Sequence, residues 1–261
     1  MAALAYLPSE LAYELKDGLC VAIVRTRDEF ARCLRAPAPG IEWLQVEGLI
    51  GDPESWALAA QGSIDIPVDV ILDDPAAEFS SLYRLVDVSN VRAVSVTIPA
   101  KPGLMKALRL AASLHLHIRL LPGQPDSDAL AELSEAAQFY LHDSMVETPV
   151  EFFHSLLAHF RGHGTGTLWS YLEQDPASST HLDADGRPIH PADFVETHVG
   201  ALVESNSECA TCRFREVCAG YFKWPDTSYD CGGVKELLST IETAADEISR
   251  ELAEQETTTP A

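Results

Sequence analysis

Short apolar, β-branched runs alternate with stretches of helical spacing between residues 19 and 122. Five runs have the length and composition of strands: 19–24, 42–46, 68–72, 93–98 and 117–121. The intervening stretches have apolar residues at helical spacing: 27–35, 53–61, 77–87 and 104–113. This alternation predicts an α/β fold whose parallel sheet is covered by helices. The sheet is either curled as a partial β/α barrel or open as in flavodoxin-like folds.

Three further helices are expected in the second half of the chain: 126–141, 150–160 and the amphipathic 233–255. Between residues 142 and 198 the sequence is rich in His, Pro and Gly, which indicates a transition between domains. The pattern divides the chain into four parts: a βα-repeat domain at 1–145, a transition segment at 146–204, a cysteine cluster with the final helix at 205–255, and a disordered tail at 256–261.

Composition and charge exclude several classes of protein. The chain has 261 residues, 46% of them hydrophobic, which is enough for a sizeable core. Its net charge of −22 repels phosphate backbones and anionic lipid surfaces, so neither nucleic acid nor membrane is an expected partner. The first 25 residues lack the basic flank and long apolar run of a signal peptide, and a cytoplasmic location is expected. In that compartment clustered cysteines bind metal more often than they form disulfides.

Four of the six cysteines follow the spacing C-x2-C-x5-C-x12-C: Cys209, Cys212, Cys218 and Cys231. A C-x2-C pair brings two thiolates to one turn, and four thiolates satisfy either a tetrahedral zinc ion or a cubane iron-sulfur cluster. Structural zinc sites usually pair two C-x2-C knuckles, whereas this chain has one, which favours iron-sulfur. Aromatic residues around the motif would give a dry shell for a cluster or a small core for any metal-bound domain.

The run C-x2-C-x5-C-x-G-Y-F with a later single Cys resembles the SPASM domain of radical SAM peptide-modifying enzymes. The resemblance implies one auxiliary [4Fe-4S] cluster bound by Cys209, Cys212, Cys218 and Cys231. The family usually has another cysteine where this chain has Phe222, so a second cluster is not expected. The C-x3-C-x2-C triad that cleaves SAM is also missing. The chain thus resembles a degenerate radical SAM relative that kept its scaffold and its outer cluster.

Other residues with reactive or metal-binding side chains have ordinary structural roles as alternatives to a function. Cys20 and Cys33 are expected to be core thiols on a strand and a helix. His115 and His117 would lie on one face of a strand, as a metal pair or as ordinary rim residues. Asp74 follows a strand, where active sites of parallel sheets lie, but with Pro75 next to it we expect it to cap a helix.

Three functions fit these observations. The first is an iron-sulfur accessory protein of a peptide maturation system of the RiPP type (ribosomally made, then modified peptides), which binds a precursor peptide or a maturase enzyme and does not cleave SAM. The second is an enzyme with its site at the carboxyl ends of the strands and a structural or electron-transfer cluster. The third is an interaction module stabilised by structural zinc. The sequence leaves open whether the chain is an enzyme.

Overall fold

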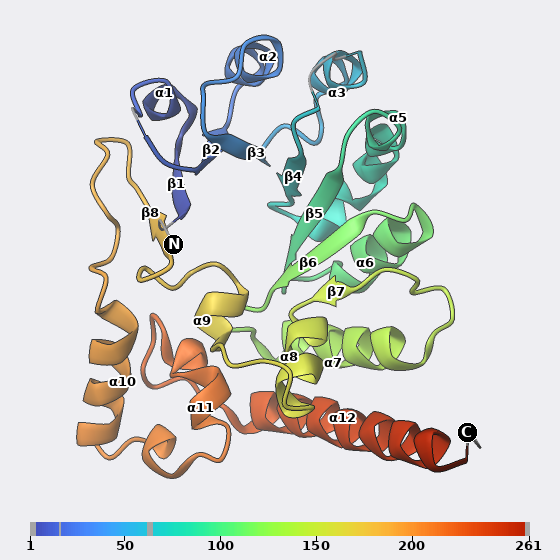
Figure 1. Ribbon diagram of the computed structural model, residues 1–261, viewed down its shortest axis with the longest axis vertical. Helices are drawn as coiled ribbons and strands as arrows, with labels where there is room; N and C mark the ends of the chain where they lie inside the picture. Colours follow the sequence, from blue (N-terminus) through green and yellow to red (C-terminus); the bar gives the residue numbers. More distant parts are fainter. Residues whose placement is uncertain (1–3, 16, 62–64, 259–261) are drawn as a thin grey trace.

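The computed structural model describes residues 4–15, 17–61 and 65–258. Within these ranges, eight parallel strands form one sheet in the order β7-β6-β5-β4-β3-β2-β1-β8. The strands are β1 (Leu4–Pro8), β2 (Cys20–Val24), β3 (Ile41–Glu47), β4 (Val68–Ile71), β5 (Val94–Pro99), β6 (His117–Leu121), β7 (Val150–Glu151) and β8 (Ser179–His181). The sheet curls into a half-barrel (Figure 1), so the α/β prediction is confirmed and its partial-barrel form is the observed one.

Helices of the first half cover the outer side of the arc, while the strands line its inner side (Figure 1). These helices are α1 (Ser9–Ala12), α2 (Arg27–Arg35), α3 (Pro53–Ala59), α4 (Pro75–Glu78), the 3-10 helix η1 (Phe79–Arg84), α5 (Leu85–Ser89), α6 (Leu104–Ser113) and α7 (Ser127–His142). Right-handed crossovers between parallel strands place successive helices on one side, which leaves the inner side free for other contacts.

Local sequence explains where these helices begin. Thr26 and Glu29 form a capping box at the start of α2. The Asp74 carboxylate accepts hydrogen bonds from the backbone N–H groups of Ala76 and Ala77, which confirms the predicted cap. Asp126 caps α7 in the same way. These caps satisfy backbone donors that have no partner within the helix.

The second half of the chain crosses below the open side of the arc (Figure 1). Its elements are α8 (Phe153–Phe160), α9 (Leu168–Tyr171), α10 (Phe194–Glu204), η2 (Glu208–Thr211), α11 (Arg215–Cys218), η3 (Tyr221–Lys223) and α12 (Gly232–Thr258). α12 packs against α7 and α8, and its apolar face joins the hydrophobic core of the sheet. No helix in the described ranges combines the length and the apolar character needed to cross a bilayer.

Several elements differ from the expectation. The strand β1 and the edge strands β7 and β8 were not expected, and Val150–Glu151 is a strand paired with β6 where a helix was expected to begin. The expected helix 77–87 is divided among α4, η1 and α5, and the tighter 3-10 turn η1 packs on α6. α12 continues to Thr258, which includes part of the expected disordered tail; residues 259–261 lie outside the described residues.

Gly103 should be among the least replaceable residues of the sheet layer. Its φ is +91°, and a Cβ there would lie 2.5 Å from the backbone of Ala76. We expect Gly103→Ala to lower the free energy of unfolding by about 2 kcal/mol or more, from backbone strain and overpacking.

Urea unfolding measures this effect, with Gly51→Ala as the control, since a Cβ at Gly51 meets nothing within 4 Å. The control should change stability by at most about 0.5 kcal/mol. Equal stabilities of the two variants would show that the α4–α6 approach is looser than described.

Candidate metal-cluster site

The cysteine segment, residues 208–231, is fastened to the loop that follows β6. The Gln124 side chain donates hydrogen bonds to the carbonyl oxygens of Phe222 and Asp226, at 3.0 and 2.7 Å. The Tyr229 hydroxyl donates to the carbonyl of Pro125 at 2.7 Å. Because this loop leaves the carboxyl end of β6, the segment lies at the carboxyl edge of the half-barrel.

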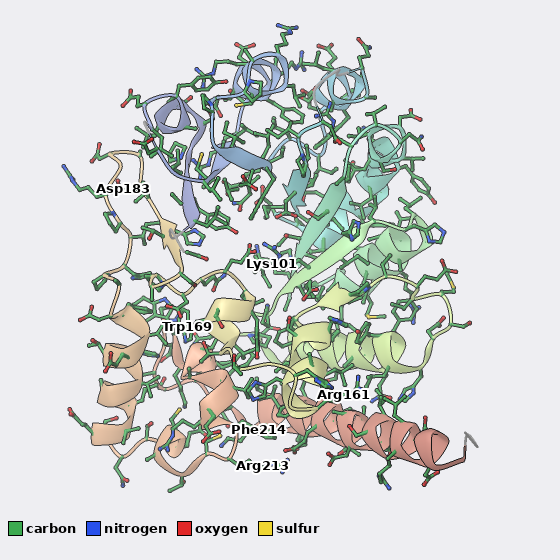
Figure 2. The ribbon with its side chains drawn as sticks, in the orientation of Figure 1. Lys101, Arg161, Trp169, Asp183, Arg213 and Phe214 are labelled. Atoms are coloured by element: carbon green, nitrogen blue, oxygen red, sulfur yellow. The ribbon has the colours of Figure 1, made fainter. Side chains whose placement is uncertain are left out.

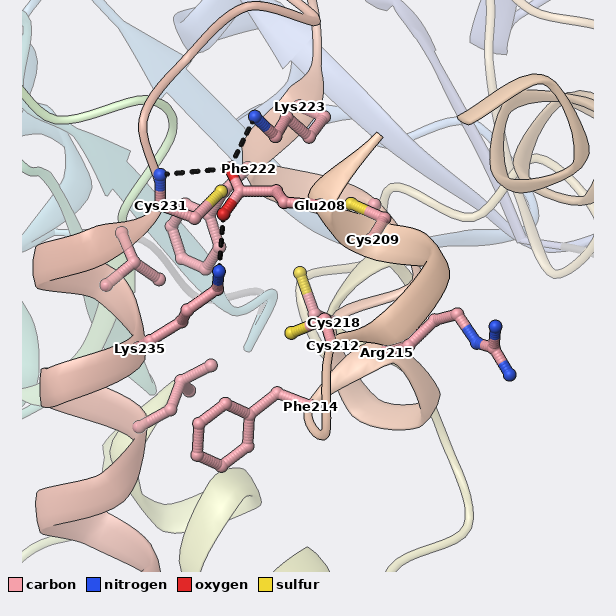
Figure 3. A pocket seen from close by; sticks show the side chains of 13 residues that line it. Glu208, Cys209, Cys212, Phe214, Arg215, Cys218, Phe222, Lys223, Cys231 and Lys235 are labelled. Carbon is pink, nitrogen blue, oxygen red and sulfur yellow. Dashed lines mark hydrogen bonds and ion pairs between the residues drawn. The ribbon is translucent and has the colours of Figure 1, made fainter. Parts of the chain in front are cut away.

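All four predicted cysteines line one pocket between the cysteine segment and the start of α12. Their sulfur atoms point into the same space (Figure 3). Cys209 and Cys231, at opposite ends of the segment, are both buried. The apolar wall of the pocket is formed by buried side chains: Phe214, Phe222, Val234 and Leu238. The structure therefore brings together the four thiols that the spacing singled out.

A left-handed turn places Cys218 in this pocket. Ala219 and Gly220 have φ values of +45° and +71°, and a Cβ at Gly220 would lie 2.7 Å from Leu202 Cδ1. The indole N–H of Trp169 donates to the Ala219 carbonyl at 2.9 Å. His198 Nε2 lies 3.1 Å from the Gly220 carbonyl and donates to it. Trp169 in α9, labelled in Figure 2, thus braces the turn from the transition segment.

Glu208 joins the two ends of the cysteine motif. Its carboxylate lies 2.6 Å from the Lys223 ammonium and also contacts the Lys235 ammonium on α12. The backbone N–H of Cys231 donates to the same carboxylate at 3.4 Å (Figure 3). Hydrogen bonds from the two lysines lower the pKa of Glu208 to about 2. The carboxylate therefore stays ionised and holds Cys231 beside the first cysteine pair.

Burial raises the pKa of three of these thiols, those of Cys209, Cys218 and Cys231. It raises the pKa of Cys218 to about 11 and that of Cys231 to about 12, the nearby Glu208 carboxylate adding to the effect at Cys231. The pKa of Cys209 is also raised by burial, while Ser207 and Lys223 oppose the shift. Since metals bind thiolates, cluster binding here must release protons.

The donor set of the pocket fits a cluster. Thiolates and sulfides make such clusters anionic, and the ammonium groups of Lys223 and Lys235 line the pocket to offset this charge. No three Cys, His, Asp or Glu side chains within the described ranges converge closely enough to hold a single metal ion. The free space at the centre is about 20 Å³, so the thiol side chains must move apart as a cluster enters.

The remaining candidates lie elsewhere. Cys20 and Cys33 are fully buried thiols on β2 and α2, as expected of core residues, and all six cysteines are free. His117 begins β6, but His115 lies in the preceding turn with φ +53° and pairs with Glu147 at 3.6 Å. The expectation that the two histidines share a strand face was therefore wrong, because the strand begins after His115.

Several residues of the site could not be identified from the sequence. Glu208, Lys223 and Lys235 carry its charge, and Trp169 and His198 fix its turn. Only Glu208 could have been suspected from the sequence, because it directly precedes Cys209. That position is not specific, since acidic residues are common on protein surfaces. Trp169 is 50 residues from the carbonyl to which it donates, so no spacing reveals the contact.

Comparison with known proteins found no match: no family model, no curated protein and no solved structure matches the chain. The chemistry of the site must therefore be inferred from its own side chains and contacts.

The Trp169 contact gives a testable prediction. Trp169→Phe keeps an aromatic ring but leaves the buried Ala219 carbonyl without its donor, so we expect a loss of about 1 to 3 kcal/mol in the free energy of unfolding. Trp224→Phe is the matched control, because Trp224 is 38% exposed and its indole N–H has no partner among the described residues. Chemical denaturation of both variants measures the difference; a Trp169 variant as stable as the control contradicts the bracing role.

Proposed function

We propose that this protein is an iron-sulfur accessory protein of a peptide maturation system, with one [4Fe-4S] cluster bound by Cys209, Cys212, Cys218 and Cys231. The observation that carries the proposal is the convergence of all four thiols on one pocket with apolar walls. The likeness of their spacing to the SPASM domain supports the same ligand set. A cluster bound there supplies either electron transfer or a covalent link between distant parts of the segment.

The protein residues would hold and insulate the cluster. Phe214, Phe222 and Leu238 would keep water from it, which protects sulfide and shifts the reduction potential. Lys223 and Lys235 would offset its negative charge, while Glu208 keeps both lysines and the Cys231 backbone in place. A single zinc ion is less well supported, since structural zinc sites usually pair two C-x2-C knuckles and this chain has one.

The proposed role does not include SAM cleavage. A catalytic cluster of the radical SAM type needs three cysteines in the C-x3-C-x2-C pattern, which the sequence lacks. The only cysteines of the first half, Cys20 and Cys33, are fully buried in the core of the sheet and its helices. An accessory role beside a complete maturase is consistent with both facts. The net charge of −22 suits a basic peptide or a basic protein surface as partner.

The ligand assignment is tested with protein purified without oxygen. We expect a brown protein with broad visible absorption and about four irons per chain. Cys212→Ser and Cys218→Ser should each lose most of the iron and the absorption, because each removes one thiolate from the pocket.

Cys33→Ala is the control, since Cys33 is a buried thiol outside the site. It should keep the iron and the colour of the unmodified chain. Iron that stays bound in both serine variants, or about one zinc per chain in every sample, would contradict the assignment.

The accessory role makes a separate prediction. We expect the neighbouring genes to encode a short precursor peptide and a complete radical SAM maturase, and the purified chain to bind one of the two. Cys209→Ser should abolish this binding while the far-ultraviolet circular dichroism of the half-barrel persists. A neighbourhood of metabolic enzymes alone, or full binding by the variant, would count against a docking role for the cysteine segment.

A further inference from the structure

The inner face of the half-barrel encloses a polar cavity that the cluster site does not use. Two adjoining cavities of about 320 and 180 Å³ share three charged side chains, Asp69, Arg119 and Glu173. The first reaches the amino ends of β4 and β5, and the second reaches the carboxyl ends of β3 and β6. We refer to both together as the interior pocket. Its length along the strands suits an extended side chain.

Asp69 forms the floor of the interior pocket. It is 4% exposed and accepts hydrogen bonds from Ser95 Oγ at 3.0 Å and from Thr97 Oγ1 at 2.9 Å. Burial raises the pKa of Asp69, whereas the charge of Arg119 and these hydroxyl donors oppose the shift. The net shift in pKa is upward and favours the neutral carboxyl, which Ser95 and Thr97 hold in place, so the floor offers fixed carboxyl oxygens to a ligand.

Glu173 forms the opposite side of the interior pocket. Its Oε2 lies 2.7 Å from the Arg119 guanidinium and accepts a hydrogen bond from the Tyr6 hydroxyl, while Oε1 has no partner among the described residues. Its φ of +57° is rare for a residue with a side chain and is held by His181 Nε2, 2.7 Å from the Glu173 carbonyl. The protein thus maintains a strained backbone at Glu173, whose side chain lines both cavities of the interior pocket.

The interior pocket has more negative than positive groups. Three carboxylates and one guanidinium line its second cavity: Glu47, Asp69, Glu173 and Arg119. Arg25 also contacts Glu47 at 2.8 Å, but its side chain is 56% exposed and therefore screened by solvent. Aromatic rings complete the wall, with Tyr6 stacked on His181 at 4.3 Å and edge-on to Trp43 at 6.0 Å. Excess carboxylates and aromatic faces in a confined space attract cations.

We propose that the interior pocket binds a basic side chain, the guanidinium or ammonium group of an arginine or lysine in a peptide. The choice of a peptide rests on the proposed role in peptide maturation, whereas the preference for a cation rests on the interior pocket itself. Glu173 Oε1 and the Asp69 floor are the acceptors, and Trp43 and Tyr6 contact the apolar stem of the side chain.

A path for the rest of such a peptide leads from the interior pocket toward the cysteine segment. A third cavity of about 210 Å³ is lined by Trp169, His190 and Trp224, and it shares Gln174 and His181 with the second cavity. Trp169 braces the Cys218 turn, and Trp224 directly follows η3. A peptide anchored by its basic side chain would therefore lie beside the cluster site.

The test uses two acetylated and amidated tripeptides, Gly-Arg-Gly and Gly-citrulline-Gly, titrated into the full chain by calorimetry. Citrulline keeps the shape of arginine and removes its charge. We expect the arginine peptide to bind at least about tenfold more tightly, with a change in tryptophan fluorescence from Trp43. Because this comparison uses the unmodified chain, it does not depend on any variant folding. Equal affinities, or no binding of either peptide, would overturn the proposal.

Two variants locate the binding. Glu173→Gln should weaken binding of the arginine peptide by about tenfold or more and leave the affinity for the citrulline peptide unchanged. Glu236→Gln, on the exposed side of α12, removes the same charge far from the interior pocket and should change neither affinity. Arginine binding unchanged by Glu173→Gln would overturn the assignment. Iron content separates the two proposals: a colourless chain that still prefers arginine refutes the cluster alone, and an iron-loaded chain without the preference refutes the interior pocket alone.

Discussion

The docking of the cysteine segment onto the loop after β6 is the contact on which the candidate site depends. Gln124 and Tyr229 make four side-chain hydrogen bonds across about a hundred residues of sequence. They hold the segment beside α12, which supplies Val234 and Leu238 to the apolar wall of the cysteine pocket. The segment has only short helical turns of its own, η2, α11 and η3, so contacts with the rest of the chain help to set its conformation. A metal cluster would add a second constraint to a segment that the fold already holds at several points.

The same arrangement separates two chemical environments along the half-barrel. The pocket at the cysteines has apolar walls and cationic groups, which suits an anionic cluster. The interior pocket is lined by carboxylates that hydroxyl groups and one guanidinium keep in place, which suits a cation. Trp169 lies between them, since it braces the Cys218 turn and lines the cavity that adjoins the interior pocket. One chain could therefore hold a cluster and present a basic peptide beside it.

The sequence predicted most of the fold where the pattern was strong and local. The strand β2 could be predicted because all five of its residues are buried and apolar. The helix α2 could be predicted from the spacing of its apolar residues and from its N-terminal cap. The short edge strands β7 and β8 were missed because two or three residues have no detectable period, and only their neighbours make them strands. Cysteine spacing identified the four thiols of the pocket, because a C-x2-C pair followed by two further cysteines is a pattern typical of metal-binding segments. Glu208, Lys223 and the interior pairing of Arg119 with Glu173 could not be found, because long-range contacts leave no local signature.

The most direct test of the central claim is native mass spectrometry of the chain purified without oxygen. The account predicts a mass above that of the polypeptide by four irons and four sulfides, an increment that Cys218→Ser removes. A polypeptide that has only one zinc ion would contradict the cluster and leave a zinc-stabilised interaction module. A polypeptide that has no metal, even after anaerobic reconstitution with iron and sulfide, would contradict any metal role for the four cysteines.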